Sequence, residues 1–298
     1  MNMILRLIYH PIINQLLRPV AKLNYALRKK ELLSVSGKLN FQTKDIQFSL
    51  QTNQTCFVTK YMFYEGFEAY EYNLLFKDLA QNAKCFLDVG ANIGLYSVLA
   101  AKYNPQIKVH AFEPGLGAVH YLRKNIEGNQ ISAQVQVHEL AMSNQDSQHE
   151  FHEAAHPKFP WLKQNLNGSS SLQAEHGRTK SKAYQVDVCR LGSFLAQQQL
   201  EQFDLLKLDT EHTEQLIIAD SQELLAANRP LIMIEIYPEI ADEIQTLLSG
   251  WSAYHYLRLE RPQLKEINLK ELGKHTTHVN YLLVPDEKLN WVSHYISK

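Results

Sequence analysis

Cysteine is scarce in this chain of 298 residues, and no two cysteines form a C-x-x-C pair. The three that are present, Cys56, Cys85 and Cys189, are scattered and odd in number. This pattern argues against a disulfide framework and against a zinc finger. It favours a protein that works in a reducing compartment, and we expect a cytoplasmic location.

The chain also lacks a charge excess and a long hydrophobic run. Its 30 lysines and arginines nearly balance its 31 aspartates and glutamates, which gives a net charge of −1. Because proteins that bind nucleic acid usually carry a basic excess, no nucleic-acid partner is expected. No stretch without charged residues reaches the ~18 residues that a membrane span needs, so no transmembrane helix is expected. The 12 glycines and 10 prolines are too few for a linker-dominated chain.

The charge that is present is unevenly distributed. Residues 1–30 contain six basic side chains and no acidic one, so this segment carries +6 and the rest of the chain −7. Apolar residues recur between the charges at mostly helical spacing, interrupted by Pro11 and Pro19. The pattern predicts a basic amphipathic helical extension over residues 1–34. We expect its apolar stripe to pack against the main domain or a second subunit, and peripheral contact with the inner face of an anionic membrane stays open as an alternative.

The next segment, residues 35–80, is expected to form a small preface of strands and a helix. Residues 35–65 alternate polar and apolar side chains, as in Ile46-Gln47-Phe48-Ser49-Leu50. Together with Cys56-Phe57-Val58-Thr59, this pattern predicts short strands of an antiparallel element. The run from Glu65 to Glu71 is then expected to lead into a helix that extends through Leu79.

From residue 81 onward, strands and helices alternate, which predicts a doubly wound α/β domain with a mostly parallel sheet over residues 81–298. The core strands are expected at residues 85–89, 108–113, 134–140, 203–209 and 230–236. Residues 253–259 and 280–284 are expected to pair at the sheet edge, and one helix is expected over 214–227. The polar stretch 143–180, with Asn167-Gly168-Ser169-Ser170-Ser171 at its centre, predicts an insertion that forms a substrate loop or a hairpin pair.

The most informative motif joins the first core strand to its helix. Asp88-Val89-Gly90-Ala91-Asn92-Ile93-Gly94 has glycines where the chain must turn tightly and where a ligand must approach the backbone. Its spacing differs from the G-x-G-x-x-G of dinucleotide-binding proteins. Glu113 ends the second strand, where a carboxylate binds ribose hydroxyls and repels a 2′-phosphate. These two features in this order predict a nucleoside or nucleotide site.

Three ordered motifs of the chain resemble those of FkbM-type S-adenosylmethionine-dependent methyltransferases. They are the run from Phe86 to Ser97, Phe112-Glu113-Pro114, and Asp204-Leu205-Leu206-Lys207-Leu208-Asp209-Thr210-Glu211. Leu140-Ala141-Met142-Ser143, the strand that begins at Pro230, and Asn280-Tyr281-Leu282-Leu283-Val284-Pro285 are similar to further segments of the family. The resemblance covers about residues 65–290.

The resemblance implies a class I methyltransferase fold, in which a Rossmann-like, mostly parallel seven-stranded sheet has an antiparallel closing strand. It also implies S-adenosyl-L-methionine as the cofactor and hydroxyl groups of sugars, polyketides or related metabolites as acceptors. Carried over by position, the cofactor would be held by a set of seven residues. Asp88, Gly90, Asn92 and Gly94 would cradle its methionine and ribose part, Glu113 would bind the ribose hydroxyls, and Ala141 and Met142 would lie near the adenine.

A hydroxyl acceptor must lose its proton, so a base has to lie beside it. The fourth core strand ends at Asp209, and ligands of an open α/β sheet gather at the carboxyl ends of its strands. We expect Asp209 or His212 to act as the base, and Glu211 and Glu235 to orient the acceptor. Glu214 is expected to stabilise the following helix through the helix dipole.

The chain departs from the family where His212-Thr213 replaces the usual Gly-Ala between two glutamates. Three functions therefore stay open: an O-methyltransferase that acts on a small-molecule or glycan acceptor, an N-methyltransferase, and a scaffold that binds S-adenosylmethionine without using it. No metal site is predicted. His149, His152 and His156 recur at helical spacing beside glutamates, but they lie in the polar insertion, where a solvated helix face is expected.

Overall fold

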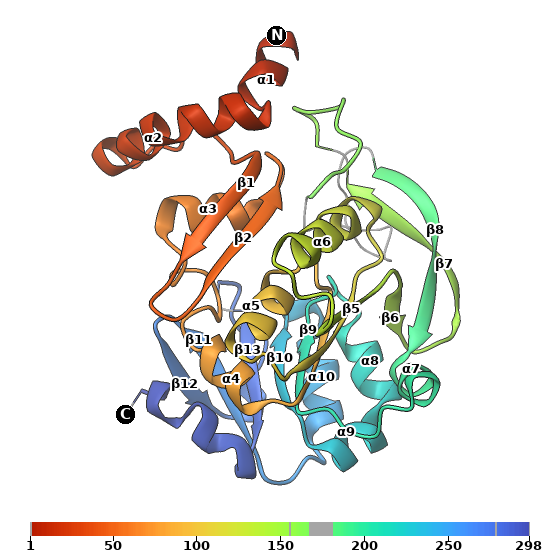
Figure 1. The fold of residues 1–298 in the computed structure, drawn as a ribbon. Helices are drawn as coiled ribbons and strands as arrows, with labels where there is room; N and C mark the ends of the chain where they lie inside the picture. The colour runs from red at the N-terminus through yellow and green to blue at the C-terminus, as the bar shows by residue number, and fades with distance from the viewer. Residues whose placement is uncertain (1, 155, 167–180, 278, 298) are drawn as a thin grey trace.

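The computed structural model describes residues 2–154, 156–166, 181–277 and 279–297 (Figure 1). The α-helices are α1 (Asn2–Ile8), α2 (Pro11–Arg28), α3 (Phe57–Glu65), α4 (Phe76–Asn82), α5 (Leu95–Tyr103), α6 (Leu116–Gly128), α7 (Leu191–Gln198), α8 (Glu214–Asp220), α9 (Gln222–Asn228) and α10 (Ala241–Leu248). The strands are β1 (Gly37–Gln42), β2 (Gln47–Thr52), β3 (Cys85–Val89), β4 (Lys108–Phe112), β5 (Val135–His138), β6 (Ala141–Ser143), β7 (Ser147–Ala154), β8 (Ser181–Arg190), β9 (Leu205–Leu208), β10 (Leu231–Glu235), β11 (Tyr254–Glu260), β12 (Gln263–Ile267) and β13 (Asn280–Pro285). Short 3-10 helices lie at Pro238–Ile240, Leu269–Glu271, Asp286–Trp291 and Ser293–Tyr295.

The central sheet has the strand order β12-β11-β13-β10-β9-β3-β4-β5. The five strands from β10 to β5 are parallel, whereas β13, β11 and β12 join the β10 edge in antiparallel pairs. The order reverses between β3 and β9, so their carboxyl ends form a crevice in which such sheets bind their ligands. This is the doubly wound fold that the alternation of strands and helices predicts.

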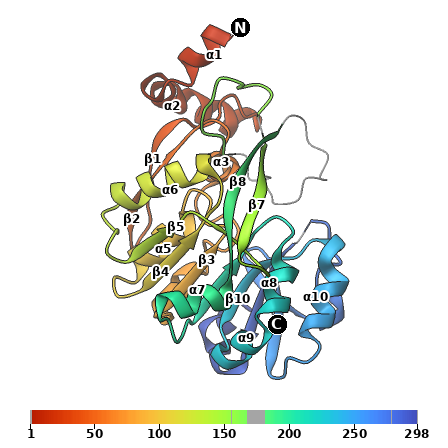
Figure 2. The same ribbon diagram turned by 90° about the vertical axis from the view of Figure 1, so that its right-hand side faces the viewer.

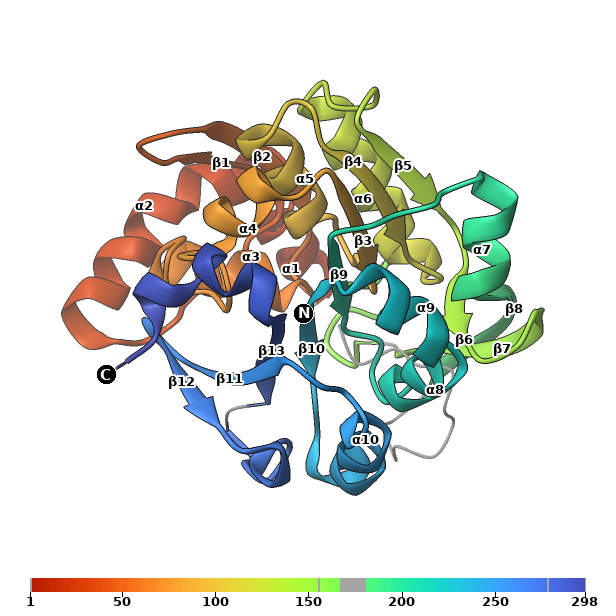
Figure 3. The same ribbon diagram turned by 90° about the horizontal axis from the view of Figure 1, so that it is seen from below.

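Helices cover both faces of this sheet, and the side chains of its strands alternate between two hydrophobic clusters. Phe86 and Leu205 pack in the cluster that α4, α5 and α6 cover, while Leu87 and Leu206 pack in the cluster that α7, α8 and α10 cover. Figure 3 shows the sheet between these two layers of helices. Burial of consecutive apolar residues on both faces explains why β3 and β9 are almost continuously apolar.

A second, three-stranded sheet has the order β6-β8-β7 and stands over the carboxyl edge of the main sheet (Figure 2). Strands β7 and β8 form a long antiparallel pair, while β6 pairs with β8 in parallel. The two long strands flank much of the predicted insertion 143–180. The predicted loop around Asn167–Ser171 lies outside the described residues.

The N-terminal helices α1 and α2 lie against the β1–β2 hairpin, at the end of the molecule away from the C-terminus (Figure 1). The hairpin in turn packs on α5 and α6 through buried side chains such as Phe48 and Leu50. No helix of the described ranges has the length and apolar character to cross a bilayer.

Three expectations about elements are wrong. Residues 57–65 form helix α3 instead of a strand, because Thr59, Met62 and Phe63 bury one helical face. The chain then turns irregularly, and α4 begins only at Phe76. The helix expected over 214–227 is interrupted at the buried Ser221, which has non-helical backbone angles, and so becomes α8 and α9.

The sheet also has eight strands, whereas the resemblance implies seven. The additional strand is β12, which forms a hairpin with β11 and lies at the edge. In β12 only Leu264 and Ile267 are buried, so its sequence carries little apolar alternation.

Candidate functional site

The site begins at the turn between β3 and α5. Gly90, Asn92 and Gly94 all have positive φ, of 76°, 51° and 83°. The amides of Gly90 and Ala91 both donate to the carbonyl of Phe112, at 3.0 and 2.9 Å, which ties the turn to β4. A Cβ at Gly90 would lie 1.8 Å from the carbonyl oxygen of Asp209, so only glycine fits there. The turn is therefore held close to the ends of both neighbouring strands.

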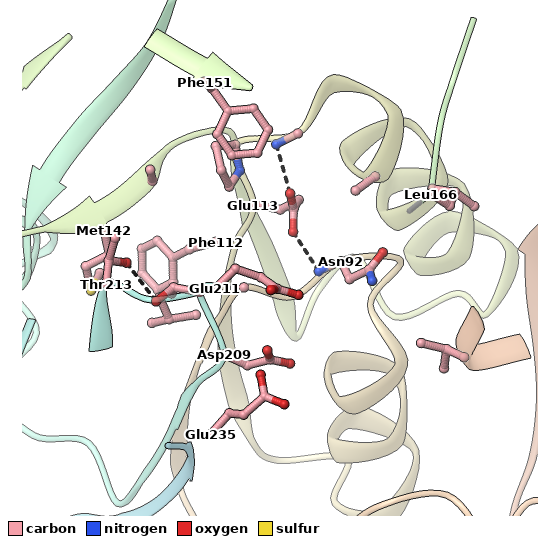
Figure 4. A pocket seen from close by; sticks show the side chains of 18 of the residues that line it. Asn92, Phe112, Glu113, Met142, Phe151, Leu166, Asp209, Glu211, Thr213 and Glu235 are labelled. Carbon is pink, nitrogen blue, oxygen red and sulfur yellow. Dashed lines mark hydrogen bonds between the residues drawn. The ribbon is translucent and has the colours of Figure 1, made fainter. Parts of the chain in front are cut away.

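Glu113 follows β4 and points into the space beside this turn (Figure 4). Its carboxylate accepts hydrogen bonds from the backbone amides of Asn92 and Gly115, each at 2.8 Å. Burial raises the pKa of Glu113 to about 7, although these two amides and the charge of Lys207 favour the ionised form. The fixed carboxylate still has free lone pairs, which suit the hydroxyls of a ribose.

Asp88 lies behind the turn and does not line the cavity. It is almost fully buried, and the hydroxyl of Ser97 donates to it at 2.6 Å. Burial raises its pKa, an effect that the nearby Lys207 opposes. Gly94 does not line the cavity either, since it packs against the side chain of Leu122. Both residues shape the turn without facing the space that it borders.

Lys207 is a buried cation that connects the glycine turn to the carboxylates beside it. It was not predicted from the sequence as a site residue. Its Nζ donates to the carbonyl of Gly90 at 3.1 Å and to the Asp209 carboxylate at 2.9 Å, and it lies 3.9 Å from the Asp88 carboxylate. Burial disfavours its charge, but Asp209 and Asp88 outweigh that effect and raise its pKa. The lysine therefore stays charged and fixes Asp209 relative to the glycine turn.

Acidic side chains gather at the carboxyl ends of β9 and β10. The carboxyl groups of Asp209 and Glu235 face each other (Figure 4). Burial, together with the charges of Asp209 and Glu211, raises the pKa of Glu235 to about 10. The pKa of Glu71 is raised by burial and then by Asp209, and its carboxylate accepts a hydrogen bond from the Tyr96 hydroxyl at 3.0 Å. At neutral pH some of these carboxyl groups are therefore protonated, while others are ionised.

The segment between β9 and α8 has an unusual backbone. Glu211 and His212 have φ values of 57° and 80°. Glu211 lines the cavity, whereas the ring of His212 packs on Tyr237 at a centroid distance of 4.7 Å and is not among the lining residues. The position at which the resembling family usually has glycine thus keeps a conformation that glycine favours, although histidine occupies it.

Glu214 has a local role. It is fully buried, and it accepts hydrogen bonds from the Thr210 amide at 2.5 Å and from the Thr210 hydroxyl at 2.8 Å. These hydrogen bonds stabilise the turn that precedes α8.

Several of the residues described above border a cavity of about 330 Å³. Ala141 and Met142, on β6, form an apolar end together with Phe112 and Phe151. The acidic end, which includes Asp209 and Glu235, lies away from Phe151 (Figure 4). The cavity is lined by the carboxyl side chains of Glu71, Glu113, Glu153, Asp209, Glu211 and Glu235. Within the described ranges, no lysine, arginine or histidine lines it.

The predicted cofactor and acceptor residues thus separate into two groups. The cavity wall includes Gly90, Asn92, Glu113, Ala141, Met142, Asp209, Glu211 and Glu235. Asp88, Gly94 and His212 lie behind it. Sequence reasoning missed Glu71, Glu153 and Lys207 as site residues. The available signal for Lys207 was a lysine inside a buried strand.

The histidines weighed as a metal patch are not on a helix. His149 and His152 lie on strand β7, where residues three apart point to opposite faces. Their spacing therefore does not bring them together. Among the residues that the structure describes, no group of three or more histidine, cysteine, aspartate or glutamate side chains is arranged to hold a metal ion.

A doubly wound sheet with a glycine turn after its first core strand and a buried carboxylate after the second defines an α/β protein built to bind a nucleoside-containing ligand. The family model described as Methyltransferase FkbM domain matches residues 88–273. The chain therefore belongs to the FkbM methyltransferase family.

Individual relatives are more distant. The chain is 28% identical over 138 residues to Methyltransferase 1 of Beauveria bassiana, a match that covers 43% of this chain and 54% of the relative. It is 26% identical over 178 residues to the AMB antimetabolite synthetase AmbE of Pseudomonas aeruginosa, covering 51% of this chain and 8% of the synthetase. The chain thus spans about half of one relative and a small part of the other. The crystal structure of the methyltransferase FkbM from Methylobacillus flagellatus is similar with a TM-score of 0.44 and 14% identity, over 67% of this chain and 43% of that one.

Proposed function

We propose that this protein transfers a methyl group from S-adenosylmethionine to a hydroxyl oxygen of a sugar, a glycan or a related metabolite. The observation that carries the proposal is the Lys207–Asp209 ion pair at the carboxyl end of β9, because it fixes a carboxylate beside the glycine turn. That carboxylate borders the same cavity as Glu113.

The hydrogen-bonding groups, the apolar residues and the charge of the cavity suit this cofactor. A buried carboxylate with two amide donors suits ribose hydroxyls, and the apolar end at Met142 suits an adenine ring. An acidic wall without basic residues among those described favours a cationic ligand and disfavours a phosphorylated one. When bound, the cofactor would supply an electrophilic methyl group on a positively charged sulfur.

The residues at the acidic end would then prepare the acceptor. We assign Asp209 as the base that takes the proton of the acceptor hydroxyl, since it lines the cavity and Lys207 holds its orientation. Glu235, with its raised pKa, keeps a proton at neutral pH and can donate a hydrogen bond to the acceptor. Glu211 would contact the acceptor from the other side of Asp209. A positioned base contributes about 10²–10⁴-fold to such a reaction.

Two other functions make different demands on Asp209. An amine acceptor has a nucleophilic lone pair once deprotonated in solution, so an N-methyltransferase would tolerate the loss of Asp209. A scaffold would bind the cofactor and transfer nothing. The ion pair by which the buried Lys207 orients the Asp209 carboxylate favours the first function, because orientation matters most for a group that moves a proton.

The test combines calorimetric titration of S-adenosylmethionine with transfer of labelled methyl from it to fractionated metabolite and glycan extracts. We expect binding, labelled product with methyl on oxygen, and a loss of about 10²–10⁴-fold in kcat for Asp209→Asn with unchanged cofactor affinity. Asp242→Asn, on the exposed side of α10, is the matched control and should keep full activity. Methyl found on nitrogen, or cofactor binding without any transfer, would contradict the proposal.

A further inference from the structure

The N-terminal helices expose most of their large apolar side chains, with 38% to 83% of each side chain accessible. In residues 1–34 these side chains are Met3, Ile4, Leu7, Ile12, Leu16, Leu17, Val20, Leu23, Leu27 and Leu32. In the rest of the described chain, only Phe57 and Leu116 are exposed in this way. On α2, the spacing of Leu16, Val20, Leu23 and Leu27 puts them on one face of the helix.

The opposite face of α2 is polar and holds the helix to the protein. The guanidinium of Arg18 donates to the carbonyl oxygens of Ser36 and Lys38, each at 2.7 Å. The side chain of Asn14 bonds to the carbonyl of Ser34 at 3.0 Å and to the amide of Ser36 at 2.9 Å. Ala21 is the third residue of α2 that is buried. The helix is therefore inverted relative to the usual surface helix, which buries its apolar face.

The expected packing of the apolar stripe against the main domain is thus not observed. Because the hydrogen bonds of Arg18 and Asn14 fix the rotation of α2, the apolar face cannot turn inward without breaking them. An exposed apolar face of this size needs a partner.

The charged side chains of residues 1–30 are all of one sign. The first thirty residues carry six basic side chains and no acidic one. Lys22 and Arg28 are exposed on the two flanks of the apolar face, and Lys29 and Lys30 follow at its end. Apolar residues flanked by basic ones are the pattern of helices that lie in the headgroup region of anionic membranes.

A second copy of the chain fits this face less well. A symmetric contact would bring two segments of charge +6 together. An asymmetric contact would need an apolar surface elsewhere on the chain, and outside residues 1–34 the described residues offer only Phe57 and Leu116. An anionic bilayer satisfies both the apolar area and the charge.

We propose that α1 and α2 form a docking surface for an anionic lipid membrane, with Leu16, Val20, Leu23 and Leu27 inserted between headgroups that contact Arg28 and Lys30. This inference is independent of the acceptor proposed above. It concerns where the protein acts, and the residues that carry it lie outside the cavity.

Substitutions test this surface better than deletion of the segment. Arg18 holds strand β1, and Tyr9 packs edge-to-face on Phe159, close in sequence to the cavity residues Asn165 and Leu166. A deletion would therefore disturb the cavity as well as the surface. Side chains on the exposed face can be changed without breaking these contacts.

The experiment measures co-sedimentation of the full chain with vesicles of phosphatidylcholine alone and of phosphatidylcholine mixed with phosphatidylglycerol. We expect binding to the mixed vesicles only, weakened by salt. Leu16→Ser combined with Val20→Ser and Leu23→Ser should lower the partition coefficient by about a hundredfold, and so should Arg28→Glu combined with Lys30→Glu. Leu116→Ser, and Lys44→Glu combined with Lys265→Glu, are the matched controls and should bind like the unaltered chain.

The proposal is wrong if the unaltered chain ignores the mixed vesicles, or if its binding survives the serine substitutions. It is also wrong if sedimentation velocity shows a dimer that dissociates on these substitutions while no vesicle binding is seen. Calorimetric titration of S-adenosylmethionine on the same variants should give unchanged affinity. That readout separates a failure of this inference from a failure of the proposed methyl transfer.

Discussion

Gly90 is a residue at which the cavity tolerates almost no change. Its φ is +76°, and any Cβ would meet the carbonyl of Asp209 at 1.8 Å. We expect Gly90→Ala to lose about 3 kcal/mol or more of unfolding free energy, since backbone strain and a backbone clash add. It should also lose cofactor binding. Gly128→Ala is the matched control, because nothing lies within 4 Å of a Cβ there and α6 gains a better helix former. Urea unfolding of both variants checks this, and equal stabilities would contradict it.

Lys207 should matter for stability as much as for activity. It is the cation between two carboxylates, and Asp88 is almost fully buried beside it. Lys207→Met leaves Asp88 without a counter-charge, which should cost about 3–5 kcal/mol of unfolding free energy. The further change Asp88→Asn removes the orphaned charge and should restore part of that loss, whereas Lys265→Met on the exposed face of β12 should be neutral. A double variant no more stable than Lys207→Met would argue against this coupling.

Individual site residues were predictable where they follow a core strand directly. Gly90, Asn92, Glu113, Asp209 and Glu235 line the cavity because the carboxyl ends of parallel strands meet at one edge.

Glu71 could not be placed from sequence in this way. It reaches the cavity from an irregular segment, with φ of 31° and a hydrogen bond from Tyr96, and both depend on how that segment packs against the finished domain. Neither the segment's composition nor its spacing carries that information.

Among whole elements, α2 depends on one buried cation for its orientation. Arg18 makes hydrogen bonds to two carbonyls of the chain around β1 and to Asn14. We expect Arg18→Ala to remove about 2–4 kcal/mol of local stability, because hydrogen bonds from charged groups are worth about 1.5–3 kcal/mol each and the carbonyls stay partly buried. Hydrogen exchange should accelerate in α2 and β1 while β3 and β9 stay protected. The control Arg28→Ala, fully on the surface, should leave all four elements unchanged, and uniform acceleration across the chain would contradict a local role.

The elements themselves were predictable to different degrees. Strands β3, β9 and β10 are short apolar runs between turns, and they lie where the sequence predicts them. Helix α3 was mistaken for a strand because Cys56-Phe57-Val58-Thr59 is too short to distinguish a strand from a helix by periodicity, and the buried Met62 and Phe63 that decide the period come later. The inversion of α2 is invisible to periodicity, since an amphipathic pattern tells which residues share a face and not which face the protein binds.

For the molecule as a whole, strand alternation predicts the doubly wound sheet. The prediction for the insertion 143–180, a substrate loop or a hairpin pair, does not include the separate sheet in which β6 joins β8 and β7. That sheet forms by pairing residues about 40 positions apart, such as Ser147 with Val188. Its strand β7 contributes Phe151 and Glu153 to the cavity. Long-range pairing of this kind depends on three-dimensional closure, which no local pattern encodes.

The protein without cofactor should lose stability as the pH rises through neutrality. Its buried acidic cavity contains carboxyls whose pKa is about 7 for Glu113 and about 10 for Glu235, against an ordinary value of 4.5. Between the ordinary and the raised pKa, such a group binds more protons in the folded state than in the unfolded state. The unfolding free energy therefore falls as pH rises in that interval.

Buried histidines oppose this effect, but only weakly above about pH 6.5, where at least half of the unfolded histidines have already lost their protons. Burial lowers the pKa of His138 to about 4 and also lowers that of His110, so their neutral forms favour folding and their contribution is complete once the unfolded histidines have lost their protons. Lys207 has a raised pKa, so its contribution is lost only in strongly alkaline solution. The interval from about pH 6.5 to about pH 8.5 thus reports mainly on the cavity carboxyls.

We expect urea unfolding to show a decrease of about 1–3 kcal/mol in unfolding free energy across that interval. Glu113→Gln and Glu235→Gln should each flatten the dependence, because each removes one titrating group, whereas the exposed Asp242→Asn should leave it unchanged. Saturating S-adenosylmethionine should stabilise the protein more at the alkaline end, because a cationic ligand binds best when these carboxyls are ionised. An unfolding free energy that stays constant or rises over the interval would show that the cavity carboxyls are ionised without ligand. The acidic wall would then be solvated by water, and its carboxyls would not depend on a bound cation for ionisation.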